Sequence, residues 1–136
     1  KPKHTVKERL IVGATSYAIM AALVNGVKYT TRIRRPDNSS YNSFPSGHTA
    51  TAFTGMEMLW QEYKDESVWI GISGYALSAV VAGMRLHNNR HWAGDVCVGA
   101  GIGILSTGFC PILLNGFRLK KNLLFRWYVT LFILLK

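Results

Sequence analysis

The stretch Asn42-Ser43-Phe44-Pro45-Ser46-Gly47-His48 places a histidine just inside the start of an expected helix. Pro45 biases the preceding residue away from helical geometry, Ser46 is a good N-cap, and an apolar-periodic run follows. The first N–H groups of such a helix lack intrahelical partners and favour an anion. Gly47 would let a phosphate-sized group approach the backbone, and His48 would supply a proton near neutral pH. A simple helix-capping turn is the alternative.

The composition describes one domain with a single core. The chain has 136 residues, of which 49% are hydrophobic, and this excludes a disordered protein. The first residue is Lys1 and no signal-peptide pattern precedes it. We therefore expect residues 1–136 to form a single helical domain that is the C-terminal part of a longer precursor.

The charge is strongly positive. Sixteen Lys and Arg against seven Asp and Glu give a formal net charge of +9, which indicates anionic partners such as phosphates, nucleic acid or acidic lipid head groups. No nucleic-acid motif accompanies this charge, so we expect no nucleic-acid partner. The cations lie at the edges of apolar segments in four clusters, each of which could also be a solvated helix end: Lys1, Lys3, Lys7 and Arg9; Lys28 to Arg35; Arg85 and Arg90; Arg118, Lys120, Lys121 and Arg126.

The cysteines do not indicate a disulfide or a metal site. Cys97 and Cys110 fall in one expected helix and lie roughly 20 Å apart along its axis, too far for a disulfide. We interpret both as small buried hydrophobic residues. Neither a Cys-x-x-Cys pair nor a His-rich spacing is present, so we expect no metal site.

Apolar segments separated by polar turns predict an all-α antiparallel bundle. The expected helices are Leu10 to Val27, Ser46 to Tyr63, Val68 to Met84, and Ala93 to about Leu114, with Pro111 ending or kinking the last. The short connection at Lys64 makes the second and third helices antiparallel, and small residues in the third allow close contact. A final apolar segment, Leu123 to Leu135, is too short to be a confident span.

The second expected helix has one apolar face. We predict that its core-facing stripe is Ala52, Phe53, Met56, Leu59, Trp60 and Tyr63, with Thr51, Thr54, Glu57, Met58 and Glu62 largely opposite. Two carboxylates in this helix and a mean hydropathy of only +0.12 leave membrane insertion open. If the bundle spans a bilayer, the positive-inside rule places the Lys1 to Arg9 cluster, Lys64 and the Arg118 to Lys121 cluster in the cytoplasm. The polar loops would then face the periplasm or exterior.

In an up-down bundle, three polar segments lie at the same end: Lys28 to Pro36, Pro45 to His48, and Arg85 to Asp95. They supply the cations Lys28, Arg35 and Arg85, the bases His48 and His91, and the carboxylate Asp95. Residues i and i+4 are neighbours on a helix, so Asp95 can accept the Nδ1–H of His91. The Nε2 atom would then keep its lone pair as a nucleophile.

The order Lys28-x6-Arg35-Pro36, Pro45-Ser46-Gly47-His48 and Arg85-x5-His91-x3-Asp95 resembles the signature of the type 2 phosphatidic acid phosphatase and vanadium haloperoxidase superfamily. The match spans residues 28 to 95, and the expected helices fit the bundle of that family. Two features depart from the family pattern. Met84 stands where a serine is usual, which implies a lost supporting hydrogen bond, and the helices that usually precede the first motif are absent from this chain.

The resemblance implies a phosphatase without a metal or other cofactor that hydrolyses phosphomonoesters or diphosphates. His91, held by Asp95, would form a phosphohistidine, and His48 would protonate the leaving oxygen. The residues that would bind phosphate are Lys28, Arg35, Ser46, Gly47 and Arg85. Vanadate, a phosphate mimic, would inhibit the reaction.

The expected substrate is a lipid phosphate if the site opens at a membrane surface. Phosphatidic acid, phosphatidylglycerol phosphate, isoprenyl diphosphate and lipid A phosphates are candidates. The expected location is a bacterial inner membrane with the site facing the periplasm. The alternatives are a soluble periplasmic acid phosphatase, a vanadium haloperoxidase, and a non-catalytic membrane module that binds anionic lipid.

Overall fold

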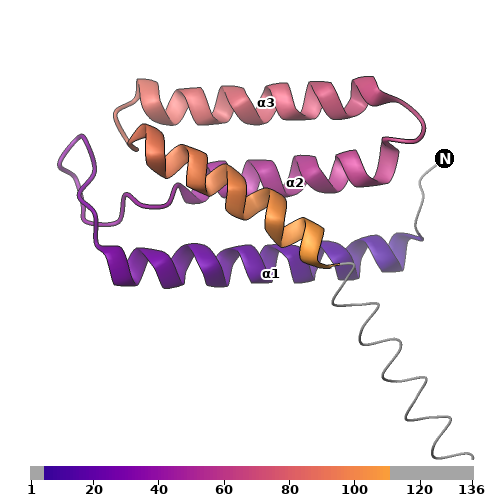
Figure 1. Ribbon diagram of the computed structural model, residues 1–136, viewed down its shortest axis with the longest axis horizontal. Helices are drawn as coiled ribbons and strands as arrows, with labels where there is room; N and C mark the ends of the chain where they lie inside the picture. Colours follow the sequence, from indigo (N-terminus) through magenta and orange to yellow (C-terminus); the bar gives the residue numbers. More distant parts are fainter. Residues whose placement is uncertain (1–4, 111–136) are drawn as a thin grey trace, which may run out of the picture.

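The computed structural model describes residues 5–110, which form an up-down arrangement of helices (Figure 1). The helices are α1 (Val6–Thr31), α2 (Gly47–Tyr63), α3 (Val68–His87) and a fourth helix, Ala93–Cys110, which reaches the last described residue. Successive helices run in opposite directions, and the fourth crosses α2 obliquely (Figure 1). Residues 5–110 contain no strand, so the predicted all-α antiparallel bundle is confirmed.

Helix α1 extends at both ends beyond the predicted apolar segment, Leu10 to Val27. Thr5 and Glu8 form a capping box, with the Glu8 N–H donating to Thr5 Oγ1 at 3.4 Å and the Thr5 N–H donating to Glu8 Oε2 at 3.1 Å. At the other end, Arg32 adopts a left-handed conformation with φ 47° and donates its N–H to Lys28 O. Lys28 therefore lies in the last helical turns and not at the start of a loop.

The third helix also extends beyond the predicted end. It continues to His87, so Arg85 lies on the last turn of α3, whereas we expected it to begin a polar loop. Positively charged residues are favourable at the negative C-terminal end of a helix dipole, which favours this extension. The predictions for Pro111, for the end near Leu114 and for the segment Leu123 to Leu135 lie outside the described residues.

Small residues let the fourth helix approach α2 backbone to backbone. A Cβ added at Gly99 would lie 2.5 Å from Ser46 O, and one added at Gly103 would lie 2.5 Å from Ala50 O. One turn further along, Thr107 Oγ1 donates to Thr54 O at 3.3 Å. Small residues spaced four apart on both helices therefore form this contact, as is typical of close helix packing in membranes.

This contact corrects the predicted core face of α2. Thr54, which we placed opposite the core, is fully buried, together with Thr49 and Ala50. The predicted apolar stripe is only half-buried: Ala52, Phe53, Met56, Leu59, Trp60 and Tyr63. Four of its side chains contact α3: Phe53, Met56, Leu59 and Trp60. There, Gly71 leaves room for the Trp60 ring and Gly74 leaves room for the Met56 side chain. The small residues of α3 thus allow close contact, as predicted, and they do so by receiving large side chains of α2.

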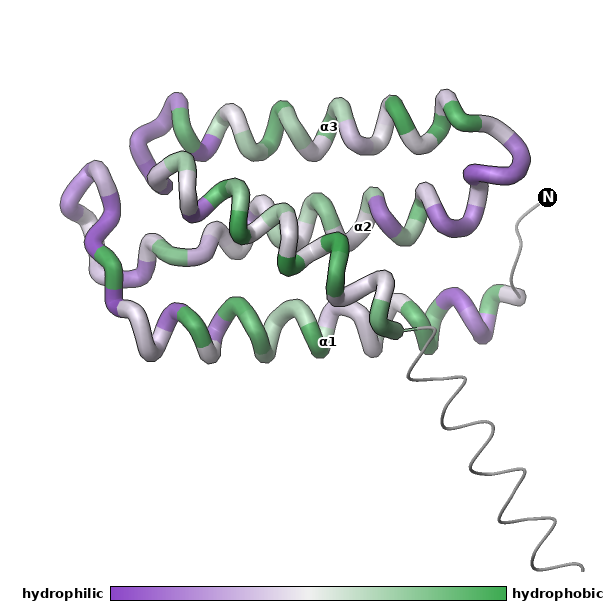
Figure 2. The backbone as a smooth tube through the Cα atoms, in the orientation of Figure 1, coloured by the Kyte–Doolittle hydropathy of each residue, from purple (hydrophilic) through white to green (hydrophobic). Residues whose placement is uncertain are grey.

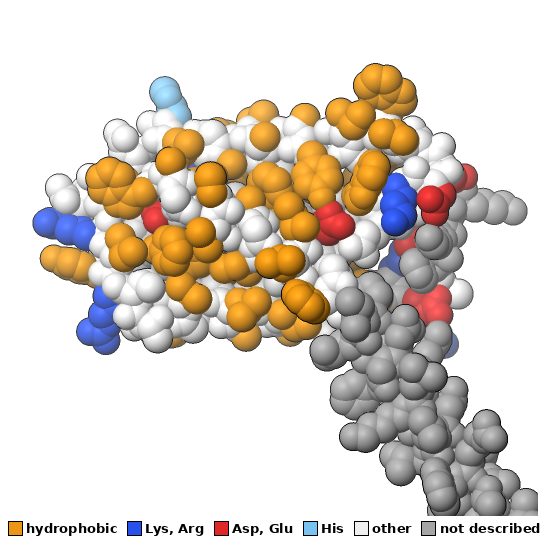
Figure 3. Space-filling model, viewed as in Figure 1, with side chains coloured by type: hydrophobic (Ala, Val, Ile, Leu, Met, Phe, Trp, Pro, Cys, Tyr) orange, Lys and Arg blue, Asp and Glu red, His pale blue; other side chains and the backbone are white. Residues whose placement is uncertain are grey.

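The outer surface of the bundle is apolar. Three of the described helices are long and apolar enough to cross a membrane: Val6–Thr31, Val68–His87 and Ala93–Cys110. Hydrophilic residues concentrate in the connections at the two ends (Figure 2). Hydrophobic side chains cover much of the visible face between these ends (Figure 3). This distribution is that of a membrane protein.

The two carboxylates of α2 that seemed costly in a membrane both have partners. Glu57 accepts hydrogen bonds from the Tyr75 hydroxyl of α3 and, at 2.9 Å, from Gln61 Nε2. Glu62 lies 3.8 Å from the Arg9 guanidinium of α1. Pairing of this kind lowers the cost of placing a carboxylate between apolar helices.

Both cysteines are free thiols, as expected from their spacing. Cys110 is buried and fits the interpretation as a small hydrophobic residue. Cys97 is exposed, so that interpretation was wrong for this residue. It lies on the opposite side of the fourth helix from the glycines that contact α2.

We predict that Gly99→Ala and Gly103→Ala each lower the thermal unfolding midpoint in detergent by several degrees. Each added methyl group would overpack a backbone contact, at a cost of about 1–3 kcal/mol. Gly101→Ala is the matched control, because a Cβ there meets nothing within 4 Å. It should be neutral or slightly stabilising, since alanine favours helix. Equal midpoints for Gly99→Ala and Gly101→Ala would contradict this packing.

Candidate active site

Hydrogen bonds join the first and third polar segments at one end of the bundle. Arg90 Nη1 donates to Asp37 Oδ2 at 3.0 Å, and the Asp37 N–H donates to Asn89 O at 3.1 Å. Trp92 Nε1 donates to Arg34 O at 3.0 Å. The convergence of these segments, predicted from up-down topology, is therefore present in the structure.

His91 is buried, with 4% of its surface exposed, directly before the fourth helix. Its Nδ1 lies 2.8 Å from the backbone oxygen of Ser43 and 3.5 Å from Asp95 Oδ2. A carbonyl can only accept, so Nδ1 carries the proton and Nε2 keeps its lone pair. The predicted free Nε2 is thus supported, but the predicted acceptor of the Nδ1 hydrogen bond was wrong: it is Ser43 O and not Asp95.

Asp95 is occupied by other donors, which explains this difference. Its carboxylate accepts from the Ser43 hydroxyl and, at 2.9 Å, from the Trp92 backbone N–H, so it caps its own helix. Its backbone oxygen accepts from the Ser46 N–H at 2.9 Å. Asp95 therefore holds both the start of the fourth helix and the segment before α2, and it faces His91 as a nearby negative charge.

The surroundings of His91 favour its neutral form. Burial lowers the pKa of His91 below its ordinary value near 6.5, and the positive charges of Lys28 and Arg35 lower it further. The hydrogen bond to Ser43 and the charge of Asp95 oppose this shift only in part. At neutral pH the imidazole is therefore an uncharged base with a free nitrogen.

His48 is the second residue of α2 and is exposed. Partial burial lowers the pKa of His48, and the nearby cations Arg85, Arg35 and Lys28 lower it further. The three cations named from the sequence thus act on one histidine, which places all three motifs around a common point. An anion bound there would reverse the shift and favour protonated His48.

Asn42 positions two of these cations. Lys28 Nζ donates to the Asn42 backbone oxygen at 2.7 Å, and Arg35 Nε donates to Asn42 Oδ1 at 2.9 Å. Sequence reasoning assigned no role to Asn42 or to Ser43. The atoms of Asn42 and Ser43 that accept from Lys28 and His91 are backbone carbonyl oxygens, which every residue has. The sequence therefore does not predict these two hydrogen bonds.

Arg85 is the third cation. Its Nε is buried and has no hydrogen-bond partner among the residues that the structure describes. Buried donors normally have partners, so an unpaired guanidinium nitrogen here fits a group arranged to bind an anion. The neighbouring Met84, which stands where the resembled family usually has serine, is 51% exposed.

The start of α2 is as predicted, with Ser46 as its N-cap. The Ser46 side chain is fully buried and lies 2.9 Å from Thr49 Oγ1, which gives its hydroxyl a structural partner. A Cβ at Gly47 would meet only ordinary contacts, 3.7 Å from Val24 and 4.0 Å from Lys28. Gly47 thus lies beside the Lys28 side chain, and phosphate binding by Ser46 and Gly47 stays a prediction.

Comparisons with known proteins find consistent relatives. The family model described as PAP2 superfamily matches residues 25–119. A Lipid A 1-phosphatase of Porphyromonas gingivalis is 44% identical over 96 residues, which are 71% of this chain and 22% of that protein. The crystal structure of Aquifex aeolicus LpxE superposes with a TM-score of 0.69 at 26% identity, over 77% of this chain and 68% of that chain. The chain thus spans about a fifth of the length of the curated relative.

We predict that Asn42→Ala weakens anion binding at this site about tenfold. The substitution removes a charge-assisted hydrogen bond that orients Arg35, worth about 1.5–3 kcal/mol, and about 1.4 kcal/mol corresponds to tenfold in affinity. Calorimetric titration with orthovanadate would measure it. Asn88→Ala, in the other loop at the same end, should bind like the unsubstituted protein. Equal affinities for all three proteins would show that Asn42 does not orient the cations.

Proposed function

The chain belongs to the PAP2 superfamily, and from this premise we propose that it is a phosphatase that hydrolyses lipid phosphates through a phosphohistidine. One observation carries the proposal. The lowered pKa of His91 leaves its imidazole neutral at neutral pH, and the Nδ1 atom is hydrogen-bonded to the Ser43 backbone oxygen. The positive charges of Lys28 and Arg35 lie near this ring. A fixed imidazole nitrogen beside cations is suited to attack a phosphorus atom whose oxygens those cations hold.

The proposed reaction has two steps. His91 Nε2 attacks phosphorus in line while the bond to the leaving oxygen breaks, and protonated His48 gives its proton to that oxygen. Water then attacks the phosphohistidine, gives its proton to His48 and releases phosphate, which restores both histidines. Lys28, Arg35 and Arg85 bind the non-bridging oxygens as negative charge develops on them.

Two observations support a lipid substrate. The residues that we propose for catalysis lie at one end of apolar helices, where a bilayer would place lipid head groups. The 44% identical relative is a Lipid A 1-phosphatase, which makes a sugar-linked lipid phosphate the first candidate. We further propose that the site faces the periplasm from the bacterial inner membrane, with Lys7, Arg9 and Lys64 at the cytoplasmic end of the bundle.

An assay of phosphate release tests this function. We expect the protein in detergent micelles to release phosphate from lipid phosphates in excess EDTA, because no step uses a metal. Orthovanadate should inhibit competitively, since it resembles the five-coordinate transition state of the attack by His91. His91→Ala should lower turnover by at least a thousandfold. His87→Ala, an exposed histidine on the last turn of α3, is the matched control and should retain full activity.

Two results would sink the mechanism. Turnover that persists in His91→Ala would show that another group is the nucleophile, and turnover that EDTA abolishes would show that a metal takes part. Quenching the reaction in alkaline detergent offers an independent check. Labelled phosphate should remain attached to the unsubstituted protein through an acid-labile, base-stable bond and should be absent from His91→Ala.

The pH dependence follows from the two lowered pKa values. His91 must be neutral to attack, so kcat/KM falls with acid only below pH 6.5. His48 must be protonated to act as acid, and its lowered pKa makes kcat/KM fall with rising pH from a point also below 6.5. The maximum of kcat/KM should therefore lie on the acid side of pH 6.5.

The profile of kcat should be shifted to higher pH, because bound phosphate favours protonated His48. In His48→Ala, activity should fall about 10²–10⁴-fold and the alkaline limb of kcat/KM should disappear. An unchanged alkaline limb in this variant would assign it to ionisation of the substrate phosphate and would contradict the acid role of His48.

A further inference from the structure

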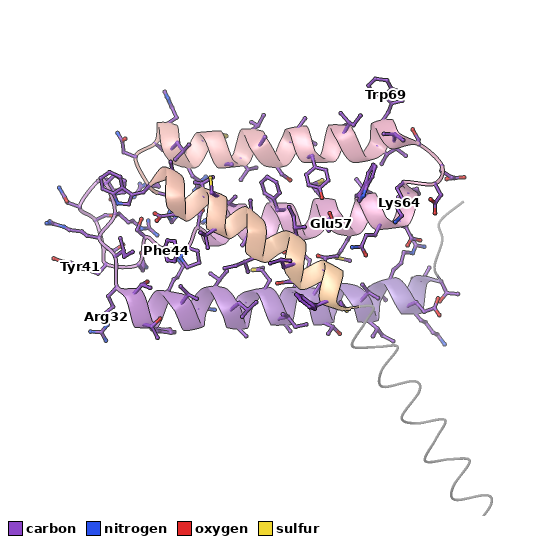
Figure 4. The ribbon with its side chains drawn as sticks, in the orientation of Figure 1. Arg32, Tyr41, Phe44, Glu57, Lys64 and Trp69 are labelled. Carbon is purple, nitrogen blue, oxygen red and sulfur yellow. The ribbon has the colours of Figure 1, made fainter. Side chains whose placement is uncertain are left out.

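Ser43 stands between the two members of the His91–Asp95 pair. Its backbone oxygen lies 2.8 Å from His91 Nδ1, and its hydroxyl donates to Asp95 Oδ2. The direct distance from His91 Nδ1 to Asp95 Oδ2 is 3.5 Å, which is long for a hydrogen bond. All three residues are buried, so solvent has little access to these contacts. The neighbouring Phe44 marks this segment at the end of the bundle opposite Trp69 (Figure 4).

The carboxylate oxygen that faces His91 already has two donors. Asp95 Oδ2 accepts from the Ser43 hydroxyl and, at 2.9 Å, from the Trp92 backbone N–H. A carboxylate has about four lone-pair sites on its two oxygens, so two donors fill the capacity of Oδ2. The Nδ1–H of His91 is thereby left to the Ser43 backbone oxygen. Ser43 thus occupies the facing atoms of both partners, one with its carbonyl and the other with its hydroxyl.

The acceptor of the Nδ1 hydrogen bond matters for the second step of the proposed reaction. A phosphohistidine formed at Nε2 of His91 is a cation as long as Nδ1 keeps its proton. A backbone carbonyl accepts a hydrogen bond from Nδ1 but does not take the proton, whereas a carboxylate can take it. Beside the carbonyl, the breaking P–N bond returns its electron pair to a cationic ring and yields a neutral imidazole. After proton loss to a carboxylate, the same step would have to expel an imidazolate, a far poorer leaving group.

The charges around His91 act in the same direction as this hydrogen bond pattern. Lys28 of α1 and Arg35 of the first loop lower the pKa of His91, whereas Asp95 of the fourth helix raises it. A closer contact between Asp95 and Nδ1 would raise this pKa further. Because a more basic imidazole leaves phosphorus more slowly, the distance between Asp95 and His91 affects how fast the intermediate breaks down.

We propose that Ser43 is a positioning residue that keeps Asp95 from taking the Nδ1 proton of His91 and thereby speeds hydrolysis of the phosphohistidine. The inference rests on the proposed phosphatase function and adds to it a control of the second step. In that step the water oxygen bonds to phosphorus, the P–Nε2 bond breaks, and its electron pair returns to Nε2. The water proton goes to His48, and Nδ1 keeps its own proton throughout.

Titration of the free protein tests the arrangement apart from turnover. In protein with isotope-labelled histidine in micelles, the nuclear magnetic resonance shifts of the ring nitrogens report protonation of His91. Ser43→Ala keeps the carbonyl and removes the hydroxyl, so the midpoint of this titration should move about one pH unit upward. Ser43→Thr keeps the hydroxyl and should restore the original midpoint. Ser39→Ala, an exposed serine of the same loop, is the matched control and should leave it unchanged.

A double substitution identifies the group that acts on His91. The upward movement requires the carboxylate of Asp95, so Ser43→Ala should have no such effect when it is added to Asp95→Asn. The same upward movement in the Asp95→Asn background would show that the Ser43 hydroxyl acts by another route and would overturn the proposal.

The lifetime of the intermediate provides the second measurement. Protein labelled in the first turnover is chased with unlabelled substrate and quenched in alkaline detergent at successive times. In Ser43→Ala, decay of the label should slow about tenfold, while its formation should change little. The fraction of labelled protein at steady state should rise accordingly. A merely structural role of Ser43 would slow formation and decay together.

The outcomes are distinct. An unchanged titration of His91 in Ser43→Ala, or equal slowing of formation and decay, would overturn the role of Ser43. Failure of the proposed function looks different: the unsubstituted protein would release no phosphate and carry no label. The titration would still decide in that case whether the Ser43 hydroxyl holds Asp95 away from His91.

Discussion

The hydrogen bonds between residues 43–46 and residues 91–95 determine the rest of the site. The Ser43 carbonyl accepts from His91, the Ser43 hydroxyl donates to Asp95, and the Ser46 N–H donates to the Asp95 backbone oxygen. These bonds fix the entrance to α2 against the entrance to the fourth helix. One short connection therefore fixes the buried His91 beside the entrance to α2, the helix whose second residue is His48.

The charges of the cations influence the pKa values of the two histidines, so these groups act together. Lys28 and Arg35 are held by Asn42, and Arg85 keeps a buried nitrogen unpaired within residues 5–110. Burial and the charges of Lys28 and Arg35 lower the pKa of both histidines, and the charge of Arg85 lowers the pKa of His48 further. A dianion would then relieve the repulsion among the cations and raise the proton affinity of the exposed histidine. Binding and proton supply are coupled in this way.

The sequence predicted the helices, their antiparallel order and the convergence of the motifs, because apolar periodicity and turn lengths determine these features. The sequence mispredicted contacts that depend on which face of a helix a residue occupies or on which atom accepts a hydrogen bond. Thr54 seemed peripheral by its polarity, yet its small size suits the contact with the fourth helix. The acceptor for His91 is a backbone carbonyl, for which no residue type is diagnostic. The roles of Ser46 and Gly47 in phosphate binding remain predictions.

The glycine contact between α2 and the fourth helix has a mechanical consequence. Gly99 lies one helical turn after Asp95 and touches the backbone at Ser46, directly before the turn that carries His48. The separation of the two histidines is thus set by how closely two helices associate. Lateral tension or an altered bilayer thickness that spreads these helices would move His91 away from His48 while both helices stay folded. Catalysis in such a bundle would report on the physical state of the surrounding lipid.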